Sequence, residues 1–377
     1  MADFTSALYL GMHHASRFLP GWDRLTMGKP AALEDPPGAG GVERQLAELI
    51  GCKRALLATS TLHVFWDLFA VLARKDVNIF LDAGAYPIIR WGVERVACSG
   101  TPVTTFGQHD PNALRKALDR ADSRPPVVVT DGYSPGLGRM APIAQYLAQA
   151  ATRGGFVVVD DSQALGIFGK PTLWLAYGLG GGGSMQHTGL TSDRSNADRL
   201  IVGASLAKAF GVPIAVLAGS VATINSFADE SATRVHCSPP SAADVAACSN
   251  ALAINRTHGD LLRTTLARNV SLFRQGLRRL GLIGVPDLFP VQPLRLPEDV
   301  DACSVHEELS RRGIHSILHR GERGKGERIS FIITARHSAG DIRQALVLLA
   351  EVLAARRRNT NRKDLRRWSI RITTQGA

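Results

Sequence analysis

The chain has 377 residues, of which 45% are hydrophobic and 20% are charged, and its formal net charge is +11. This length and composition suit a soluble globular protein with two domains, or with one large domain and an appendage. A membrane helix is excluded, because no stretch of the sequence reaches roughly 18 to 20 continuous apolar residues. The acidic Asp3 near the start argues against a signal peptide.

Much of the positive charge lies in the C-terminal segment 356–377. A basic segment can bind nucleic acid, and a nucleic-acid binder that uses this segment is the non-enzymatic alternative. No nucleic-acid-binding motif accompanies the segment, however, and chain ends are commonly solvated. We therefore expect a flexible basic tail.

The five cysteines are scattered and never have C-x-x-C spacing. This pattern predicts reduced thiols in a cytoplasmic protein, with neither a disulfide framework nor a metal site. The five are Cys52, Cys98, Cys237, Cys248 and Cys303.

Apolar segments that alternate with helical patterns organise most of the chain. Residues 1–40 are rich in Gly and Pro and form an irregular N-terminal segment, after which an amphipathic helix begins near Val42. Helical segments, including those over 112–121 and 143–153, separate most of the strands. Seven strands are predicted at 54–58, 77–81, 101–105, 127–130, 156–159, 200–202 and 215–218. This alternation predicts a large α/β domain over 41–265 with a mostly parallel sheet.

A second, smaller domain is expected over 266–355. A long helical region covers 241–280, and a smaller α+β pattern follows it. The elements predicted in this domain are a strand at 292–296, a helix at 302–312, a strand at 329–334 and a helix at 339–354.

Lys208 is the most informative residue of the sequence. It is a lone lysine among small apolar residues, just after the strand at 200–202, and Asp160 ends the strand at 156–159. Pyridoxal 5'-phosphate needs an amine to hold its aldehyde as a Schiff base and an anion to keep its ring nitrogen protonated. Each residue alone fits a solvated lysine or an ordinary strand end. Together they favour a site for this cofactor.

A phosphate site is expected close by. Thr59, Ser60 and Thr61 stand between a strand and a helix, where free N–H groups and the helix dipole favour an anion. Ser205 lies three residues before Lys208 and offers a hydroxyl to the same phosphate. Once a substrate amine has released it, Lys208 is placed to act as a general base.

Five segments, in order, resemble motifs of the fold-type I pyridoxal phosphate enzymes, and most closely of the α-oxoamine synthase family. Residues 157–166 are similar to that family's V-D-E-A-H-x-x-G strand end, and 203–211 to its T-L-G-K-A-x-G lysine motif. Residues 234–240, 289–294 and 327–338 resemble three later motifs. The resemblance covers roughly Gly41 to Ala354. It implies a large seven-stranded, mostly parallel sheet domain and a smaller α+β domain.

The resemblance also assigns roles to single residues. It implies that Lys208 is the Schiff-base lysine and that Asp160 is the partner of the ring nitrogen. Tyr86 stands where the family has a stacked His, and Gln163 replaces a His beside the cofactor's phenolic oxygen. Ser238 matches a residue that reaches the phosphate of the neighbouring subunit, which implies a homodimer. The residues that match the family's phosphate ligands are Ser60, Thr61, Leu62 and Ser205.

One departure from the family affects the substrate. Ser330 stands where family members carry an Arg for the substrate carboxylate. Either Arg320 or Arg323 supplies that contact, or the amine substrate is not a standard α-amino acid. The alternative for these two arginines is exposed loop charge.

The resemblance implies C-acylation of an amino acid or amine by an acyl thioester of CoA or of a carrier protein, with or without decarboxylation. An aminotransferase of specialised metabolism is the alternative, since Lys208 and Asp160 serve both reactions. Ser205-x-x-Lys208 also matches the S-x-x-K of serine acyltransferases, but the K-T-G and S-D-N motifs of that class are absent. Gly178-x-Gly180-x-x-Gly183 fits a dinucleotide fingerprint without a clear βαβ context.

Overall fold

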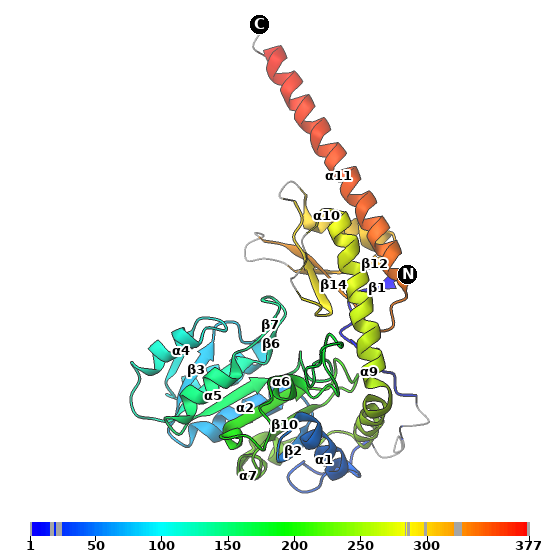
Figure 1. The fold of residues 1–377 in the computed structure, drawn as a ribbon. Helices are drawn as coiled ribbons and strands as arrows, with labels where there is room; N and C mark the ends of the chain where they lie inside the picture. Colours follow the sequence, from blue (N-terminus) through cyan, green and yellow to red (C-terminus); the bar gives the residue numbers. More distant parts are fainter. Residues whose placement is uncertain are drawn as a thin grey trace. The chain divides into compact units, whose positions relative to one another are not determined.

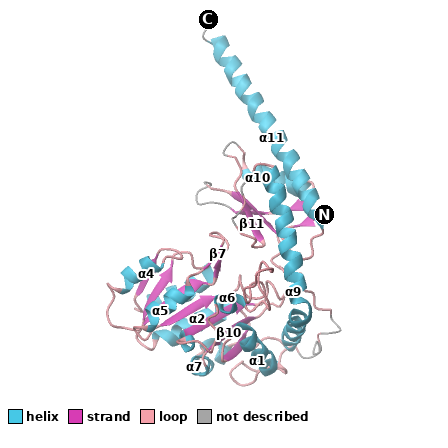
Figure 2. Ribbon diagram, viewed as in Figure 1, coloured by secondary structure: helices cyan, strands magenta, loops and turns pink. Residues whose placement is uncertain are grey.

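The chain divides into two compact units in its computed structural model (Figures 1 and 2). The structure describes residues 2–15, 19, 25–282, 284, 287–297, 300–319 and 326–374, with the backbone alone after 356. The larger unit is Leu10–Thr264, and the smaller unit joins Met1–Tyr9 to Thr265–Ala377. The boundary falls within helix α9 (Ala242–Arg279).

A seven-stranded sheet forms the centre of the larger unit, in the order β2-β10-β9-β8-β5-β3-β4. Neighbouring strands from β9 to β4 are parallel, whereas β10 is antiparallel to both β2 and β9. The predicted α/β fold with a mostly parallel sheet is therefore confirmed. The strands are β2 (Arg54–Ala58), β3 (Asn78–Asp82), β4 (Val103–Phe106), β5 (Pro126–Asp131), β8 (Phe156–Asp160), β9 (Leu200–Ser205) and β10 (Ala215–Gly219).

Helices cover both faces of this sheet, which explains why the inner strands β5, β8, β9 and β10 are mainly apolar rather than alternating. Val158 of β8 packs in one core cluster with α2 (Thr61–Ala73) and α3 (Pro87–Cys98). Because side chains alternate along a strand, Val157 and Val159 face the other side, and both are fully buried. The helices α4 (Pro111–Leu118) and α5 (Ile143–Ala151) pack on β4, β5 and β8, and α1 (Ala39–Ile50) packs on β2 and β10.

Several short elements of the larger unit were not predicted from the sequence. The most consequential is α3, which begins with Pro87 directly after Tyr86. Proline suits the first helical position because the N–H that it lacks has no intrahelical partner there. The other unpredicted elements are β6 (Tyr133–Ser134), β7 (Arg139–Met140), α6 (Gly183–Thr188), α7 (Val221–Glu230) and α8 (Ala232–His236).

The glycine run 178–183 lies in the loop between β8 and α6. In the fully described stretch 25–282, no strand of the sheet ends directly before this run. Asp260 accepts a hydrogen bond from the N–H of Gly180 at 3.0 Å. Gly181 has a φ of +72°, and a Cβ there would lie 2.4 Å from Nη1 of the buried Arg263. Close packing against α9 accounts for Gly181, whereas Gly180 has open space around it and a φ of +85°.

The smaller unit contains a three-stranded antiparallel sheet in the order β11-β14-β13, next to α10 (Ala302–Arg311). Its strands are β11 (Val291–Leu294), β13 (Ile317–His319) and β14 (Arg328–Ile332). The start of the chain belongs to this unit, because β1 (Ala2–Asp3) pairs in parallel with β12 (Ile314–His315). Phe4 is fully buried and stacks on His337, with 4.2 Å between the ring centres. Pairing with residues far along the chain thus orders the first residues, which the sequence indicated to be irregular.

The last helix is longer than the sequence indicated. A helix was expected over 339–354, and α11 runs from Ala339 to Thr374. The segment expected to be a flexible tail is therefore helical as far as Thr374, and it contains arginine, lysine and leucine but no proline. None of the described helices is long and apolar enough to cross a membrane.

Candidate active site

Three aspartates end three neighbouring strands of the large sheet. Asp82 ends β3, Asp131 ends β5 and Asp160 ends β8, and these strands are adjacent and parallel. Asp131 and Asp160 are direct partners in the register of β5 and β8. The carboxyl ends of parallel strands form the usual ligand-binding edge of such sheets. This edge therefore concentrates carboxyl groups.

Lys208 comes to this edge from the turn between β9 and β10. Its Nζ lies 5.6 Å from the centre of the Tyr86 ring. Burial lowers the pKa of Lys208, while the charges of Asp160 and Asp131 act in the opposite direction and raise it. A lysine with a lowered pKa supplies more of the neutral, nucleophilic amine at neutral pH.

Asp160 is 5% exposed, and its Oδ1 accepts the N–H of Ser162 at 3.0 Å. Burial raises the pKa of Asp160, and the hydrogen bond from Ser162 and the charge of Lys208 oppose that effect. The Ser162 hydroxyl in turn accepts the N–H of Ser205 at 2.9 Å, which joins the ends of β8 and β9. Asp160 and Lys208 thus lie at one edge, as the sequence predicted.

Tyr86 contacts Asp131 through its main chain and lies near Lys208 through its ring. Its side chain is 51% exposed, and its N–H donates to Oδ1 of Asp131 at 3.1 Å. The residue occupies the position before α3, so the start of that helix sets the backbone position of Tyr86. The structure therefore brings the predicted aromatic residue next to the predicted lysine.

The first turn of α2 offers free hydrogen-bond donors. Ser60 caps the helix and accepts the N–H of His63 at 3.4 Å. Within 25–282, the N–H groups of Thr61 and Leu62 donate no hydrogen bond to the protein. Free N–H groups at a helix N-terminus bind anions. His63 Nδ1 lies 2.8 Å from the Ser60 hydroxyl and 3.1 Å from that of Thr59.

The remaining predicted cofactor residues lie in the larger unit. Ser205 ends β9, and its hydroxyl accepts the N–H of Ala207 at 3.3 Å. Gln163 is half-buried in the turn that follows Asp160. Ser238 is exposed, and it lines a cavity of about 20 Å³ together with Thr59 and His63 of its own chain.

Of the three predicted substrate residues, only Ser330 lies in the described part of the chain. Ser330 is 0% exposed in β14, and its hydroxyl has no hydrogen-bond partner among the described residues. Arg320 and Arg323 lie outside the described residues. A role for any of the three toward a substrate stays a prediction.

The sequence analysis missed Asp82, Asp131 and His63 at this site. Asp131 had a signal, because it closes an apolar strand in the same way as Asp160 does. Burial raises the pKa of Asp131 to about 8; the charge of Asp160 adds to this rise, and the N–H of Tyr86 opposes it. His63 had no signal beyond its position after the helix start.

Asp161 follows Asp160 in the sequence but has another environment. It is 0% exposed, its Oδ2 accepts the N–H of Ser184 at 3.0 Å, and burial raises its pKa from 3.8 to about 7. The folded state therefore keeps this proton at pH values where the unfolded chain has released it.

Because the unfolded chain loses this proton first, the contribution of Asp161 to the free energy of unfolding should fall as pH rises from 3.8 to about 7. The expected fall over that pH range is roughly 4 kcal/mol. Asp161→Asn keeps an acceptor for Ser184 but cannot ionise. Urea unfolding of the cofactor-free protein should show Asp161→Asn gaining stability over wild type between pH 5 and pH 8. The exposed Asp198→Asn is the control. An equal difference from wild type at both pH values would contradict the burial argument.

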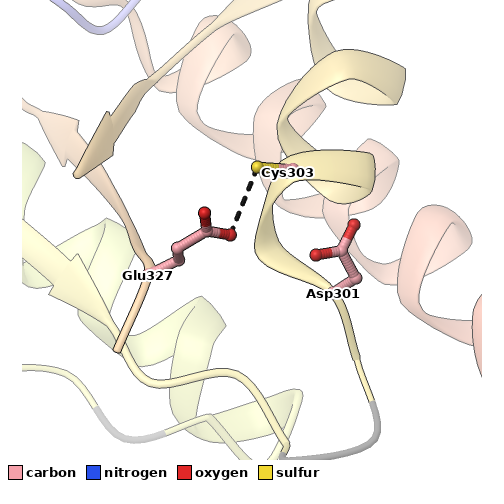
Figure 3. A group of neighbouring side chains, drawn as sticks. All are labelled: Asp301, Cys303 and Glu327. Carbon is pink, nitrogen blue, oxygen red and sulfur yellow. Dashed lines mark hydrogen bonds between the residues drawn. The ribbon is translucent and has the colours of Figure 1, made fainter. Parts of the chain in front are cut away.

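A separate cluster of polar side chains lies in the smaller unit (Figure 3). One ligand atom from each of Asp301, Cys303 and Glu327 lies within 4.8 Å of the others. The Cys303 thiol donates to Oε2 of Glu327 at 3.2 Å, and Asp301 caps α10 by accepting the N–H of Ser304 at 2.8 Å. Local hydrogen bonds thus account for each of the three groups. None of the five cysteines, which all lie in the described part of the chain, forms a disulfide bond.

The groups at the edge of the large sheet match what pyridoxal 5'-phosphate requires. Lys208 offers an amine with a lowered pKa, and Asp160 offers a buried anion beside it. Tyr86 presents an aromatic ring near the amine, and the start of α2 presents free N–H donors for a phosphate. The donor set therefore fits the cofactor that the sequence indicated.

Comparisons with known proteins agree with this assignment. The family described as "Aminotransferase class I and II" matches residues 22–324. The 8-amino-7-oxononanoate synthase of Halorhodospira halophila is 30% identical over 82% of this chain and 73% of its own length, and that of Nitrosococcus oceani is 27% identical over 93% and 91%. Among solved structures, Sphingomonas wittichii serine palmitoyltransferase has a TM-score of 0.80 at 19% identity, covering 94% of this chain and 87% of its own. The 8-amino-7-oxononanoate synthase of Francisella tularensis has a TM-score of 0.74 at 19% identity, covering 94% and 98%.

Proposed function

Because the chain belongs to the aminotransferase class I and II family and, within it, to the fold-type I α-oxoamine synthases, it is a pyridoxal 5'-phosphate enzyme, and we propose that it uses Lys208 to condense an amine with an acyl thioester. The observation that carries the proposal is the meeting of Lys208, Tyr86 and the buried Asp160 at one sheet edge.

We propose the following residues for holding the cofactor. Asp160 pairs with the ring nitrogen, and the Tyr86 ring stacks on the pyridine. The free N–H groups at the start of α2 bind the phosphate, with help from the Ser205 hydroxyl. The side-chain amide of Gln163 donates to the phenolic oxygen.

The bound cofactor supplies an electron sink for a carbanion at the substrate carbon next to the amine. The residues of the protein keep the ring protonated and move the substrate proton. The Asp160 carboxylate keeps the ring nitrogen protonated, since a nearby anion favours the charged form of a base. Lys208 Nζ, whose pKa burial lowers, takes up and returns a proton as a general base.

The proposed substrates follow from the relatives, whose names describe 8-amino-7-oxononanoate synthase and serine palmitoyltransferase. We propose an amino acid or an amine as one substrate and an acyl thioester of CoA or of a carrier protein as the other. Ser330 at the family's carboxylate-binding position favours an amine other than glycine, alanine or serine, unless Arg320 or Arg323 binds the carboxylate.

The test is to incubate the holoenzyme with a panel of amines and acyl-CoA thioesters and to measure thiol release together with the mass of the product. Release of thiol that depends on the amine, with a C-acylated product, supports the proposal. An aminotransferase would instead convert a 2-oxo acid into an amino acid without any thioester. That outcome would replace acyl condensation by transamination at the same Lys208.

We propose that the active unit is a homodimer in which Ser238 serves the site of the neighbouring subunit. Sedimentation at working concentration should show a dimer. Mixing Lys208→Ala with Ser238→Asp, each inactive alone, should restore activity, because mixed dimers contain one intact site. A fully active monomer, or a mixture that stays inactive although subunits exchange, would contradict the shared site.

A further inference from the structure

Asp131 is a carboxyl group at the candidate site with two contacts of different kinds. Its Oδ1 accepts the main-chain N–H of Tyr86 at 3.1 Å, and the ring of that tyrosine lies 5.6 Å from Lys208 Nζ. Its strand position pairs it directly with Asp160. Asp131 thus adjoins both the aromatic residue and the anion of the site.

The two carboxyl groups have different hydrogen-bond environments. Oδ1 of Asp160 accepts a hydrogen bond from Ser162, which stabilises the charged form. Asp131 accepts the single hydrogen bond from Tyr86 within the described stretch 25–282, and none reaches its second oxygen. The charged groups that face Asp131 are Asp160 from β8, Asp82 from β3 and Lys208 from the turn after β9.

We propose that Asp131 is a positioning residue, which holds the Tyr86 ring beside Lys208 and tunes the proton affinity of Lys208 by carrying or releasing one proton. This role rests on the proposed function of the site. This role differs from that of Asp160. Asp131 acts on the proton affinity of Lys208 and on the position of the Tyr86 ring, whereas Asp160 pairs with the ring nitrogen of the cofactor.

The electrostatics of the site agree with this role. Two carboxylates side by side in a buried place resist ionising together, so one of them keeps a proton. Burial and the charge of Asp160 raise the pKa of Asp131 to about 8. Below this pH Asp131 is neutral, so of these two carboxyl groups only Asp160 acts on Lys208 with its charge. Above this value the Asp131 charge stabilises the ammonium form of Lys208.

The experiment separates the two parts of the role with two variants. Asp131→Asn keeps an oxygen for the N–H of Tyr86 but loses the charge, whereas Asp131→Ala loses both. Asp110→Asn is the matched control, because Asp110 is an exposed helix cap and its replacement keeps an acceptor for Asn112 and Ala113.

The first measurement is the rate at which acetic anhydride labels Lys208 in the cofactor-free protein, followed by mass spectrometry from pH 6.5 to pH 9. Removing an ionised neighbour lowers the pKa of Lys208 by about one unit, so Asp131→Asn should label roughly three- to tenfold faster at pH 9. At pH 6.5 the rates should match, because Asp131 is neutral in wild type. Equal rates at pH 9 would overturn the charge role.

The second measurement is the visible circular dichroism of bound pyridoxal 5'-phosphate, which reports how the surrounding groups hold the ring. Asp131→Ala should lose most of this signal, and Asp131→Asn should keep it. A wild-type signal in both variants would overturn the positioning role. If Asp131→Ala does not fold, the Asp131→Asn labelling still decides the charge role. Failure of wild type to bind the cofactor would refute the proposed function instead, and the labelling would still test the coupling of Asp131 to Lys208.

Discussion

Lys208→Ala is expected to abolish covalent retention of pyridoxal 5'-phosphate and to lower turnover at least roughly 100-fold. The variant lacks both the amine that attaches the cofactor and the group that moves the proton. Borohydride treatment of wild-type holoenzyme, followed by peptide mass spectrometry, should place the reduced cofactor on Lys208. The same treatment of Lys208→Ala should leave no labelled peptide.

The matched control is Lys170→Ala, since Lys170 is an exposed lysine of the same unit. It should keep both the label and the activity. A reduced adduct on a lysine other than Lys208 in the wild-type protein would remove Lys208 from its proposed role, and with it the proposed arrangement of the site.

Asp160→Asn is expected to retain the cofactor while losing activity, roughly 100-fold. The attachment through Lys208 and the phosphate contacts remain, but a neutral amide does not hold the ring nitrogen protonated. Turnover and the amount of bound cofactor should be measured on the same preparation, so that loss of chemistry is distinguished from loss of binding.

Asp161→Asn is the control for this variant, because Asp161 is the neighbouring buried carboxyl and contacts Ser184 rather than Lys208. It should keep most of the activity. Near-normal turnover of Asp160→Asn would exclude Asp160 as the partner of the ring nitrogen.

The strands of the large sheet could be predicted because most of the signals that mark a strand lie in consecutive residues. Apolar runs mark the strands of this sheet, except for the edge strand β4, whose two threonines are exposed. Each strand was found within a few residues of its predicted position. The sequence analysis named no helix at α3, although Ile89, Val93 and Val96 recur there at helical spacing after Pro87. The length of α11 was missed because its C-terminal part was taken for a solvated chain end, whereas arginine and lysine are good helix formers.

The sequence by itself indicated the fold class and the cofactor, with Lys208 as the candidate for its attachment and Asp160 as the candidate partner of its ring nitrogen. Apolar periodicity and short motifs reside in neighbouring residues, so they can be read without the fold. Only the tertiary structure decided that Asp131 lies beside Asp160, and that Tyr86 binds Asp131 and faces Lys208. The pairing of β1 with β12 is of the same kind. These contacts join residues far apart in the chain. Strand order and register set such contacts, and no local pattern of residues specifies which strands become neighbours.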